Sequence, residues 1–396
     1  MPFIPMIDTL VATFDIKNYD DSARNLLEKL DKKKFEAKIA LTENSNQKAI
    51  LQIGPMNFEV LSNGKKGYAY LLHNELYEIN LSQYRSKNKD FYPVYIKVKS
   101  ECLWSCGPYK AWNNICEWVK AWIGEPIDNK ISRIDLCCHT DEIQLYEEDI
   151  ENFKGQYYTE QMYRYRRNVN AMCFGSSASN KVYCRIYDKV LEVTQKNNKK
   201  WFFSLWKDKG LNLKKVWNVE FQINREFLKD RNINTVWQAF DSLGSIWKYC
   251  TENWLVKIYR DNLNISRCSI DDEWQGLQRA FSGFRSEPLI KREKQLNDDA
   301  ESIVPSAYGF LTTIAAKKGI TDISVALQTL QISGESYLRS KKLDFARVVN
   351  SKKKLLDSQK KEKNLYDEIE ESQRRRVSQN AIDKILESRR LDCERV

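Results

Sequence analysis

The stretch KVYCRIYDK, Lys181 to Lys189, alternates between apolar and polar residues along its length. Side chains of a β-strand point to opposite faces in turn, so the stretch predicts a strand with two unlike faces. Its apolar face, suited to a core, carries Val182, Cys184 and Ile186. Its other face carries two phenols and two cations, on Tyr183, Arg185, Tyr187 and Lys189.

Two other stretches show the same alternation. ISRIDLCCH, residues 131–139, places Asp135 and Arg133 opposite an apolar face, and VWNVEFQI, residues 216–223, does the same for Glu220. If the three strands lie in one sheet, Asp135, Glu220 and Tyr187 share a face. The pattern therefore predicts either a functional site or an ordinary wet face of an antiparallel sheet.

The functional alternative has definite chemistry. Two carboxylates, on Asp135 and Glu220, suit a divalent cation such as Mg²⁺ or Mn²⁺. A tyrosine beside that cation can attack phosphorus, and the cation would neutralise charge on the scissile phosphate. Lys189 or Arg185 would stabilise the Tyr187 phenolate or bind the adjacent phosphate. In this alternative, Tyr187, Lys189 and Arg185 are the catalytic residues, whereas on an ordinary wet face they are solvated.

Composition limits the class of protein. The 396 residues suggest two or three domains, because single cores stop growing at roughly 250–300 residues. Lys and Arg number 64 against 54 Asp and Glu, and the net charge of +10 favours an anionic partner such as nucleic acid. No apolar run approaches the roughly 20 residues needed to span a bilayer, and the start MPFIPMIDTL lacks the pattern of a secretion signal. We expect a cytoplasmic protein with ten reduced cysteines.

The order of predicted elements indicates an α+β fold. A first strand, IDTLVATFDI, precedes a helix, and short alternating runs between residues 48 and 99 predict more strands of an antiparallel sheet. Helical spacing follows in YKAWNNICEWVKAWIG, through Trp112, Ile115, Val119 and Trp122. Helical periodicity returns after residue 230. The predicted fold is a central antiparallel sheet with flanking helices, followed by a helical C-terminal region.

The stretch YYTEQMYRYRRN, residues 157–168, interleaves tyrosines with arginines in a predicted loop before the tyrosine strand. Aromatic faces on which bases stack, mixed with guanidinium groups that meet phosphates, are typical of single-stranded DNA binding. An edge strand with ordinary solvated arginines accounts for the pattern equally well. The residues expected to bind DNA are Tyr163, Arg164, Tyr165, Arg166, Arg167 and, on the polar face, Arg133.

Three motifs in order, SRIDLCCHTD, FGSSASNKVYCRIYDK and WNVEFQINREF, resemble the replication initiation factor family. That family comprises trans-acting initiators of rolling-circle replication in plasmids and filamentous phages, with related relaxases of conjugative elements. The resemblance implies a site-specific DNA nickase whose tyrosine cuts one strand, stays joined to the 5′ phosphate and later rejoins the ends. By position it implies Tyr187 as the nucleophile and Asp135 and Glu220 as metal-site residues.

Histidine content sets this chain apart from the more widespread rolling-circle nucleases, which bind metal through a histidine pair. The chain has two histidines, His73 and His139, far apart in sequence. His139 lies on the predicted face of Asp135, so it is either a third metal ligand or a residue that is exposed or supports the ligands from outside. Tyr183 is expected to form a wall of the site or a stacking surface.

The predicted organisation has three parts. Residues 1–284 form a DNA-nicking domain, residues 285–300, with Pro288, form a linker, and residues 301–396 form a helical, basic C-terminal region. That region recognises duplex DNA at an origin, contacts a host helicase or the second subunit of a homodimer, or presents solvated helix faces. No membrane partner is expected.

We therefore expect a rolling-circle replication initiator that nicks and joins single DNA strands at an origin with Mg²⁺ or Mn²⁺. A conjugative relaxase would use the same chemistry at a transfer origin. A non-catalytic DNA-binding regulator would keep the basic and aromatic surfaces but would need no carboxylates facing Tyr187.

Overall fold

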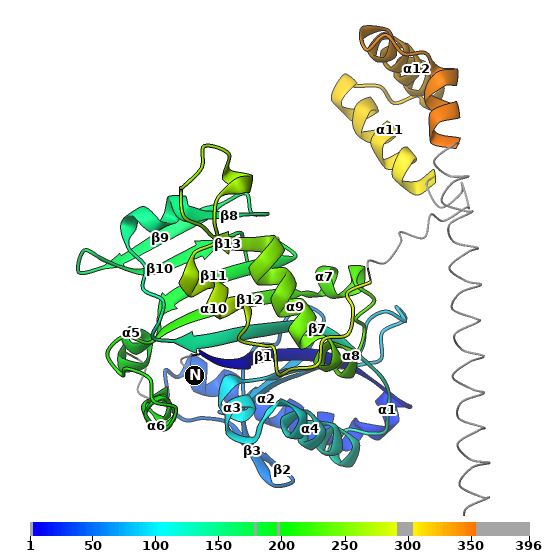
Figure 1. Ribbon diagram of the computed structural model, residues 1–396. Helices are drawn as coiled ribbons and strands as arrows, with labels where there is room; N and C mark the ends of the chain where they lie inside the picture. The colour runs from blue at the N-terminus through cyan, green and yellow to red at the C-terminus, as the bar shows by residue number, and fades with distance from the viewer. Residues whose placement is uncertain (1–2, 178–179, 196–198, 291–303, 354–396) are drawn as a thin grey trace, which may run out of the picture. The chain divides into compact units, whose positions relative to one another are not determined.

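The structure, a computed structural model, describes residues 3–177, 180–195, 199–290 and 304–353 (Figure 1). Contacts divide the chain into two units, Met1–Glu293 and Lys294–Val396. The first unit holds all the strands of the described ranges, and the second is described over 304–353. Within the same ranges, no helix has both the length and the hydropathy that crossing a bilayer requires.

An eleven-stranded antiparallel sheet forms the centre of the first unit. Its order is β2-β3-β4-β5-β6-β1-β7-β12-β11-β10-β9, so the two long strands β1 and β7 lie in the middle. The strands are β1 Phe3–Ile16, β2 Ile50–Ile53, β3 Met56–Val60, β4 Tyr70–His73, β5 Tyr77–Leu81, β6 Val94–Val98, β7 Pro126–Thr140, β9 Glu160–Tyr165, β10 Asn168–Phe174, β11 Val182–Asp188 and β12 Trp217–Asn224. A separate small sheet pairs β8 Phe153–Gly155 with β13 Leu255–Lys257.

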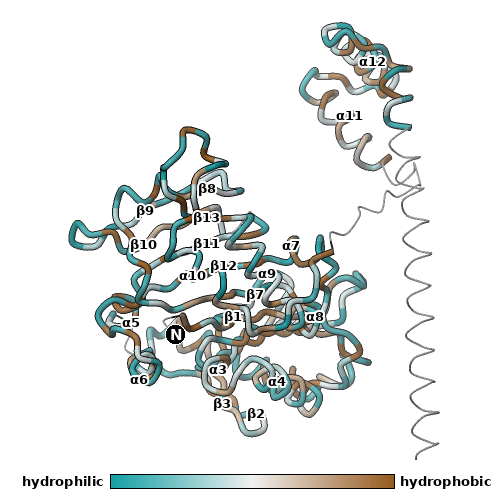
Figure 2. The backbone as a smooth tube through the Cα atoms, viewed as in Figure 1, coloured by the Kyte–Doolittle hydropathy of each residue, from teal (hydrophilic) through white to brown (hydrophobic). Residues whose placement is uncertain are grey.

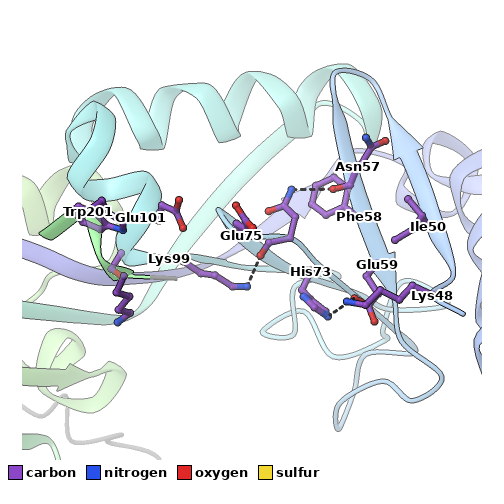
Figure 3. A pocket seen from close by; sticks show the side chains of 13 residues that line it. Lys48, Ile50, Asn57, Phe58, Glu59, His73, Glu75, Lys99, Glu101 and Trp201 are labelled. Atoms are coloured by element: carbon purple, nitrogen blue, oxygen red, sulfur yellow. Dashed lines mark hydrogen bonds and ion pairs between the residues drawn. The ribbon is translucent and has the colours of Figure 1, made fainter. Parts of the chain in front are cut away.

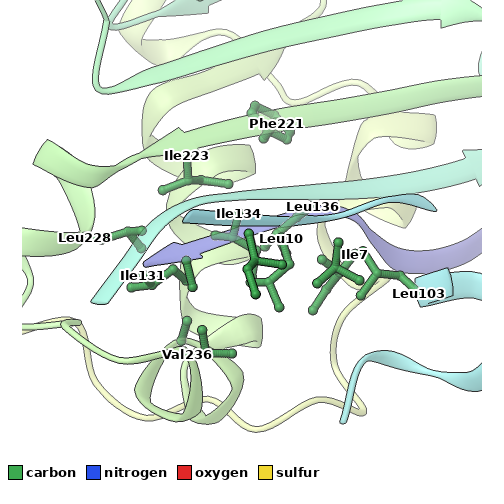
Figure 4. Packing of buried hydrophobic residues seen from close by; sticks show 14 of the residues in the cluster. Ile7, Leu10, Leu103, Ile131, Ile134, Leu136, Phe221, Ile223, Leu228 and Val236 are labelled. Atoms are coloured by element: carbon green, nitrogen blue, oxygen red, sulfur yellow. The ribbon is translucent and has the colours of Figure 1, made fainter. Parts of the chain in front are cut away.

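Helices cover the apolar face of this sheet. They are α1 Tyr19–Ser22, α2 Arg24–Thr42, α3 Ser100–Cys106, α4 Pro108–Trp122, α7 Arg225–Asp230, α8 Val236–Asp241, α9 Leu243–Lys248 and α10 Asp272–Gln278. Shorter turns lie at Glu147–Asn152, Tyr249–Trp254 and Ile265–Arg267. Figure 4 shows the buried contact, which joins helix residues Leu103, Leu228 and Val236 to strand residues Ile7, Leu10, Ile131 and Ile134.

The opposite face of the sheet carries polar side chains and is covered at one end by α5 Lys189–Gln195 and α6 Trp201–Asp208. The two helices bury a second, smaller core, made of Ile4, Val193, Phe202, Trp206, Leu211 and Val216. Helix α5 begins directly after β11, and the Asp188 carboxylate accepts from the Leu191 backbone N–H over 2.9 Å at this junction. KVYCRIYDK is therefore a strand through Asp188, and its last residue, Lys189, begins a helix.

The arginine-rich stretch forms β9 and the tight turn to β10 rather than a loop. Arg166 and Arg167 occupy the turn with φ of 48° and 70°, values typical of hairpin turns that follow the twist of the strands. The turn is hydrophilic (Figure 2). The stretch is therefore an edge strand of the large sheet.

The second unit contains two helices, α11 Val304–Lys318 and α12 Ile323–Ser340, which contact each other. Asp322 caps α12 by accepting from the Val325 backbone N–H over 3.0 Å. The α+β class, with its antiparallel sheet, flanking helices and helical C-terminal region, is confirmed. The part of the predicted C-terminal region from residue 354 onward lies outside the described residues.

Two isoleucines of β7 test the packing of the central strand. Ile131 is fully buried and Ile127 is 59% exposed. Ile131→Ala should lower the free energy of unfolding by about 2–5 kcal/mol because it leaves a cavity, whereas Ile127→Ala should change it by less than about 0.5 kcal/mol. Tryptophan fluorescence in urea measures this, since all 11 tryptophans lie in the first unit. Equal losses in both variants would contradict the assigned burial.

Candidate active site

Three neighbouring strands bring the predicted site residues onto one face of the sheet. In the antiparallel register, Arg185 of β11 pairs with Glu220 of β12, and Tyr187 pairs with Asn218. Asp135, on the adjacent strand β7, lies diagonally across from Glu220. Paired residues point to the same side of a sheet. The expected shared face of Asp135, Glu220 and Tyr187 is therefore present.

The hydroxyl group of Tyr187 has three polar partners. It donates to Glu220 Oε2 over 3.0 Å, and it accepts from Asn218 Nδ2 over 2.9 Å and from Lys189 Nζ over 3.1 Å. One donated and two accepted bonds fill the capacity of a neutral phenol. After loss of its proton, the oxygen would keep two donors, and Glu220 is the acceptor already in contact with that proton.

Burial sets the protonation of Tyr187 and Lys189. Burial raises the pKa of Tyr187 well above its ordinary value, and the charge of Glu220 raises it further while Lys189 opposes the rise. Burial alone would lower the pKa of Lys189, but Tyr187, Asp8 and Glu192 raise it well above its ordinary value. Lys189, which is 1% exposed, is therefore a cation held against a neutral phenol.

Each carboxylate expected to bind metal is paired with an arginine. Arg133 Nε donates to Asp135 Oδ1 over 2.7 Å, and Arg185 forms an ion pair with Glu220. The carboxyl groups are almost fully buried, whereas the Arg133 and Arg185 side chains are 30% and 37% exposed. Burial raises the pKa of Asp135 to about 6, against the hydrogen bond from Arg133. Each buried carboxylate is thus paired with an arginine whose side chain is partly exposed.

Asp8 is a third carboxyl group of this face, and our sequence analysis missed it. Its Oδ1 atom is buried and has no hydrogen-bond partner in the described part of the chain. Burial raises its pKa, and Glu220 raises it further. Asp8 lies at a β-bulge between Ile7 and Thr9 of β1, where strict alternation fails. The available signal is an Asp near the middle of a largely apolar strand.

Asn218 and Glu192 are two further members that our sequence analysis missed. Asn218 lies two residues before Glu220 on the same strand, so alternation already places it on the correct face. Glu192 Oε2 lies 2.7 Å from Lys189 Nζ, one helical turn further along α5. That spacing becomes informative only when the helix is known to start at Lys189.

His139 is buried, so among the alternatives for this residue the exposed position is wrong. Its ring stacks on Trp104, with centroids 4.7 Å apart, and Trp206 Nε1 donates to its Nδ1 atom over 3.0 Å. Burial lowers the pKa of His139 well below its ordinary value, so the ring is neutral. Its Nε2 atom has no hydrogen-bond partner among the residues described. Trp104 of α3 and Trp206 of α6 therefore hold the ring, and because Nδ1 accepts a hydrogen bond, the proton of the neutral ring lies on Nε2, which is then a donor and not a metal ligand.

The donor chemistry of Asp135 and Glu220 fits Mg²⁺ or Mn²⁺. These cations prefer oxygen, and Mg²⁺ is usually held by one or two carboxylates, with water and substrate phosphate filling its shell. The unpartnered Oδ1 atom of Asp8 adds a buried oxygen to the same face. Over the described ranges, no three His, Cys, Asp or Glu side chains are arranged to enclose an ion. A bound cation would therefore share carboxylate oxygens with Arg133 and Arg185 or displace them.

The tyrosines expected to bind DNA adjoin this site. Tyr163 of β9 pairs with Ala171 of β10, and Ala171 pairs with Tyr187, so the two tyrosines lie in one row on one face. Two strand spacings separate them, about 10 Å. Tyr163 and Tyr165 are 49% and 41% exposed. The hairpin thus presents aromatic rings in the same row as Tyr187.

The arginines of the hairpin differ in their partners. Arg164 forms an ion pair with Glu147. Arg166 and Arg167 are exposed in the turn, and neither forms an ion pair with another described residue. The guanidinium group of Arg166 lies 5.4 Å from the centre of the Tyr165 ring. Arg166 and Arg167 are therefore better placed than Arg164 to bind a phosphate.

A cavity of about 420 Å³ lies beside α6 (Figure 3). Its lining includes Lys199, whose Nζ atom lies 3.5 Å from Glu192, so the cavity adjoins the Lys189 contacts. The lysines and glutamates of the wall are equal in number, with Lys48, Lys99 and Lys199 against Glu59, Glu75 and Glu101. That balance does not favour a polyanion.

Comparisons with known proteins found similarity among solved structures. No family model matches the chain, and no curated protein matches it. Among solved structures, a rolling circle replication initiator protein from Geobacillus stearothermophilus is similar to this chain, with a TM-score of 0.44 and 14% sequence identity. The similarity covers 73% of this chain and 100% of the other chain.

Proposed function

We propose that the protein is a rolling-circle replication initiator that nicks and rejoins single DNA strands through a covalent bond to Tyr187. The observation that carries this proposal is the environment of the Tyr187 hydroxyl, where a carboxylate acceptor and two nitrogen donors lie within 3.1 Å. Perturbed, buried ionisable groups are concentrated at functional sites. The family resemblance of the motif around Tyr187 supports the same reaction.

In the cutting step, the Tyr187 oxygen attacks the phosphorus of a phosphodiester, and its proton passes to Glu220 Oε2. A bond forms between the tyrosine oxygen and phosphorus, and the bond from phosphorus to the 3′ oxygen breaks. The departing oxygen takes a proton from solvent and becomes a free 3′ hydroxyl, from which a polymerase can extend. In the joining step, a 3′ hydroxyl oxygen attacks the phosphorus and its proton passes to solvent. The bond from phosphorus to the tyrosine oxygen breaks, and Tyr187 takes back the proton held by Glu220.

Lys189 and Asn218 stabilise the phenolate while it forms. Both already donate to the Tyr187 oxygen, so no reorganisation is needed when negative charge develops there. Glu192 offsets the buried charge of Lys189. These contacts lower the cost of ionising a phenol whose pKa burial has raised.

We assign the Mg²⁺ or Mn²⁺ of the reaction to Asp135 and Glu220. The cation, when bound, would neutralise charge on the scissile phosphate. Arg133 and Arg185, whose guanidinium groups are partly exposed, would bind the phosphates on either side of the cut. The hairpin would hold the strand through stacking on Tyr163 and Tyr165 and through the turn arginines.

A conjugative relaxase remains the second candidate because the same contacts serve nicking at a transfer origin. A non-catalytic regulator is less well supported, since regulation does not require a buried lysine and a carboxylate on one phenol. We assign contacts with origin duplex, a host helicase or a second subunit to the C-terminal unit, whose helices expose large apolar side chains such as Phe310 and Ile332.

The nucleophile is tested with two tyrosines of the same strand face. Full-length protein is incubated with Mn²⁺ and single-stranded DNA bearing the origin, and covalent adduct is measured on a denaturing gel. Tyr187→Phe should abolish the adduct because it removes the attacking oxygen. Tyr183→Phe, the matched control, should form adduct at close to the normal rate. Adduct that persists in Tyr187→Phe and is absent in Tyr183→Phe would reverse the assignment.

The acidic residues are tested by substitution and by chelation. Asp135→Asn and Glu220→Gln should each slow adduct formation by about 100-fold or more, because each removes a charge needed for the phosphoryl step. EDTA should abolish the adduct in the wild-type protein, and added Mn²⁺ should restore it. Glu59→Gln, in a strand remote from Tyr187, is the control. A normal rate of adduct formation in EDTA would contradict the proposed metal dependence.

The hairpin is tested through the salt dependence of binding. Replacing Arg166 and Arg167 by Asn, which tolerates positive φ, should weaken single-stranded DNA binding at low salt. The slope of log affinity against log salt should fall by about 0.7 for each phosphate that the variant no longer binds. Fluorescence anisotropy at several NaCl concentrations measures this. Arg164→Asn should have a smaller effect because of its ion pair with Glu147, and an unchanged slope in the turn variant contradicts the assignment.

A further inference from the structure

Two basic, aromatic loops meet at the end of the sheet where β4 and β6 begin. The first joins β3 to β4 and contains NGKKGY, residues 63–68, and the second joins β5 to β6 and contains QYRSKNKDF, residues 83–91. Asp90 is their single anion, against the cations Lys65, Lys66, Arg85, Lys87 and Lys89. The β9–β10 hairpin, at one edge of the sheet, has the same combination of aromatic and basic residues.

A cavity of about 500 Å³ lies between these loops. Its lining includes three aromatic residues and three polar ones, Tyr68, Tyr84, Phe91, Lys65, Gln83 and Ser86. The rings of Tyr68 and Phe91 pack with centroids 5.0 Å apart, and Tyr84 is 66% exposed. Ring faces for stacking, side-chain hydrogen-bonding groups and nearby cations together suit an unpaired nucleobase with its phosphates.

The two loops are fixed to each other and to the sheet. Gly67 has φ of 84°, and a Cβ atom there would lie 2.8 Å from the Phe91 ring, so the close approach requires glycine. The Tyr68 hydroxyl donates to the Tyr92 carbonyl over 3.1 Å and links the loops. Arg85 forms an ion pair with Asp15 of β1. A pocket organised in advance loses less entropy when it binds.

The pocket lies on the same face of the sheet as Tyr187. Tyr68 packs on Tyr95 of β6, with centroids 5.7 Å apart, and Lys65 Nζ lies 5.8 Å from the Tyr95 ring. Burial raises the pKa of Tyr95, and the charges of Arg133 and Asp135 also act on it. The pocket therefore adjoins Tyr95, on which the charges of Arg133 and Asp135 of the candidate active site act.

The strand register gives the approximate distance between the pocket and Tyr187 along the sheet. Tyr95 pairs with Thr13 of β1, and Thr13 pairs with Lys130 of β7. His139, in the row of Tyr187, lies nine residues further along β7. At about 3.3 Å per residue this is about 30 Å. A single DNA strand would cover that distance with several nucleotides.

We propose that this pocket binds an unpaired base of the DNA strand whose scissile phosphate lies at Tyr187. Lys66, Lys87 and Lys89, all exposed, bind the phosphates next to that base. The proposal deepens the proposed function, on which it rests, by adding a recognition site several nucleotides from the cut. It also explains why basic, aromatic segments stand at both ends of the same face.

The test uses full-length protein carrying Tyr187→Phe, so that binding is measured without cleavage. Single-stranded oligonucleotides that contain the cut site are lengthened stepwise on each side, and affinity is measured by fluorescence anisotropy. On one side, reaching the pocket should tighten binding by about 5- to 150-fold, the range for one stacked base. Adding Tyr84→Ala or Phe91→Ala should remove this gain while leaving the affinity of short oligonucleotides unchanged.

Controls separate the pocket from general effects. Tyr109→Ala, on α4 at the helix-covered face, removes a 38%-exposed tyrosine and should keep the gain. A 2-aminopurine placed at the predicted position should change its fluorescence on binding, and Tyr84→Ala should remove that change. The proposal is overturned if pocket variants bind oligonucleotides of every length like the parent, or if they lose affinity equally at all lengths.

Failure of the pocket is distinguishable from failure of the proposed function. If wild-type protein forms the Tyr187 adduct and the pocket variants keep the length-dependent gain in affinity, the proposed base binding in the pocket is wrong and the proposed nicking activity is supported. If no adduct forms but Tyr84→Ala removes the gain in affinity, the proposed nicking activity is wrong and the proposed base binding in the pocket is supported.

Discussion

The antiparallel pairing of β7, β12 and β11 decides how the rest of the first unit is arranged. Because side chains alternate along each strand, one register sends Ile134, Phe221 and Ile186 toward the helices and sends the charged groups to the other face. A shift by one residue would exchange the two faces. The core and the candidate active site are therefore consequences of the same pairing.

Burial of charge then distinguishes this site from a wet sheet face. Asp135 and Glu220 are 0% and 2% exposed, and Lys189 is 1% exposed. Buried charges are costly unless they are paired, and each of these has an opposite charge in contact. A solvated face would leave such residues exposed. The wet-face alternative therefore does not describe these three residues, and the proposed reaction at Tyr187 would make use of their charges.

Alternation along a strand is the predictable part of the site. The period of two is enough to place Asp135, Glu220 and Tyr187 on one face. It fails at Asp8, where a bulge changes the phase, and at Glu192, because the strand turns into a helix inside the motif. Local patterns also cannot show what covers a residue. The burial of His139 depends on α6, about 65 residues later, whose Trp206 contacts its ring.

Helical spacing meets a similar limit. The stripe on α4 predicts a buried Trp122, but this side chain is 46% exposed while Trp118 is buried. The sheet edge near Trp122, at Gly54, covers one part of the ring, and spacing alone does not show how far such cover extends. The cavity between the two basic loops is unpredictable for the same reason, since it joins segments about 20 residues apart.

Locating the residue bonded to DNA tests the central claim most directly. After reaction with Mn²⁺ and origin DNA, nuclease and trypsin digestion leave a nucleotide on one peptide, which mass spectrometry identifies. Trypsin cuts after Arg185 and so separates the two tyrosines of the strand, leaving Tyr187 in IYDK, residues 186–189. The account predicts the nucleotide on that peptide. A nucleotide on VYCR, with Tyr183, or on a hairpin peptide with Tyr163, would contradict it.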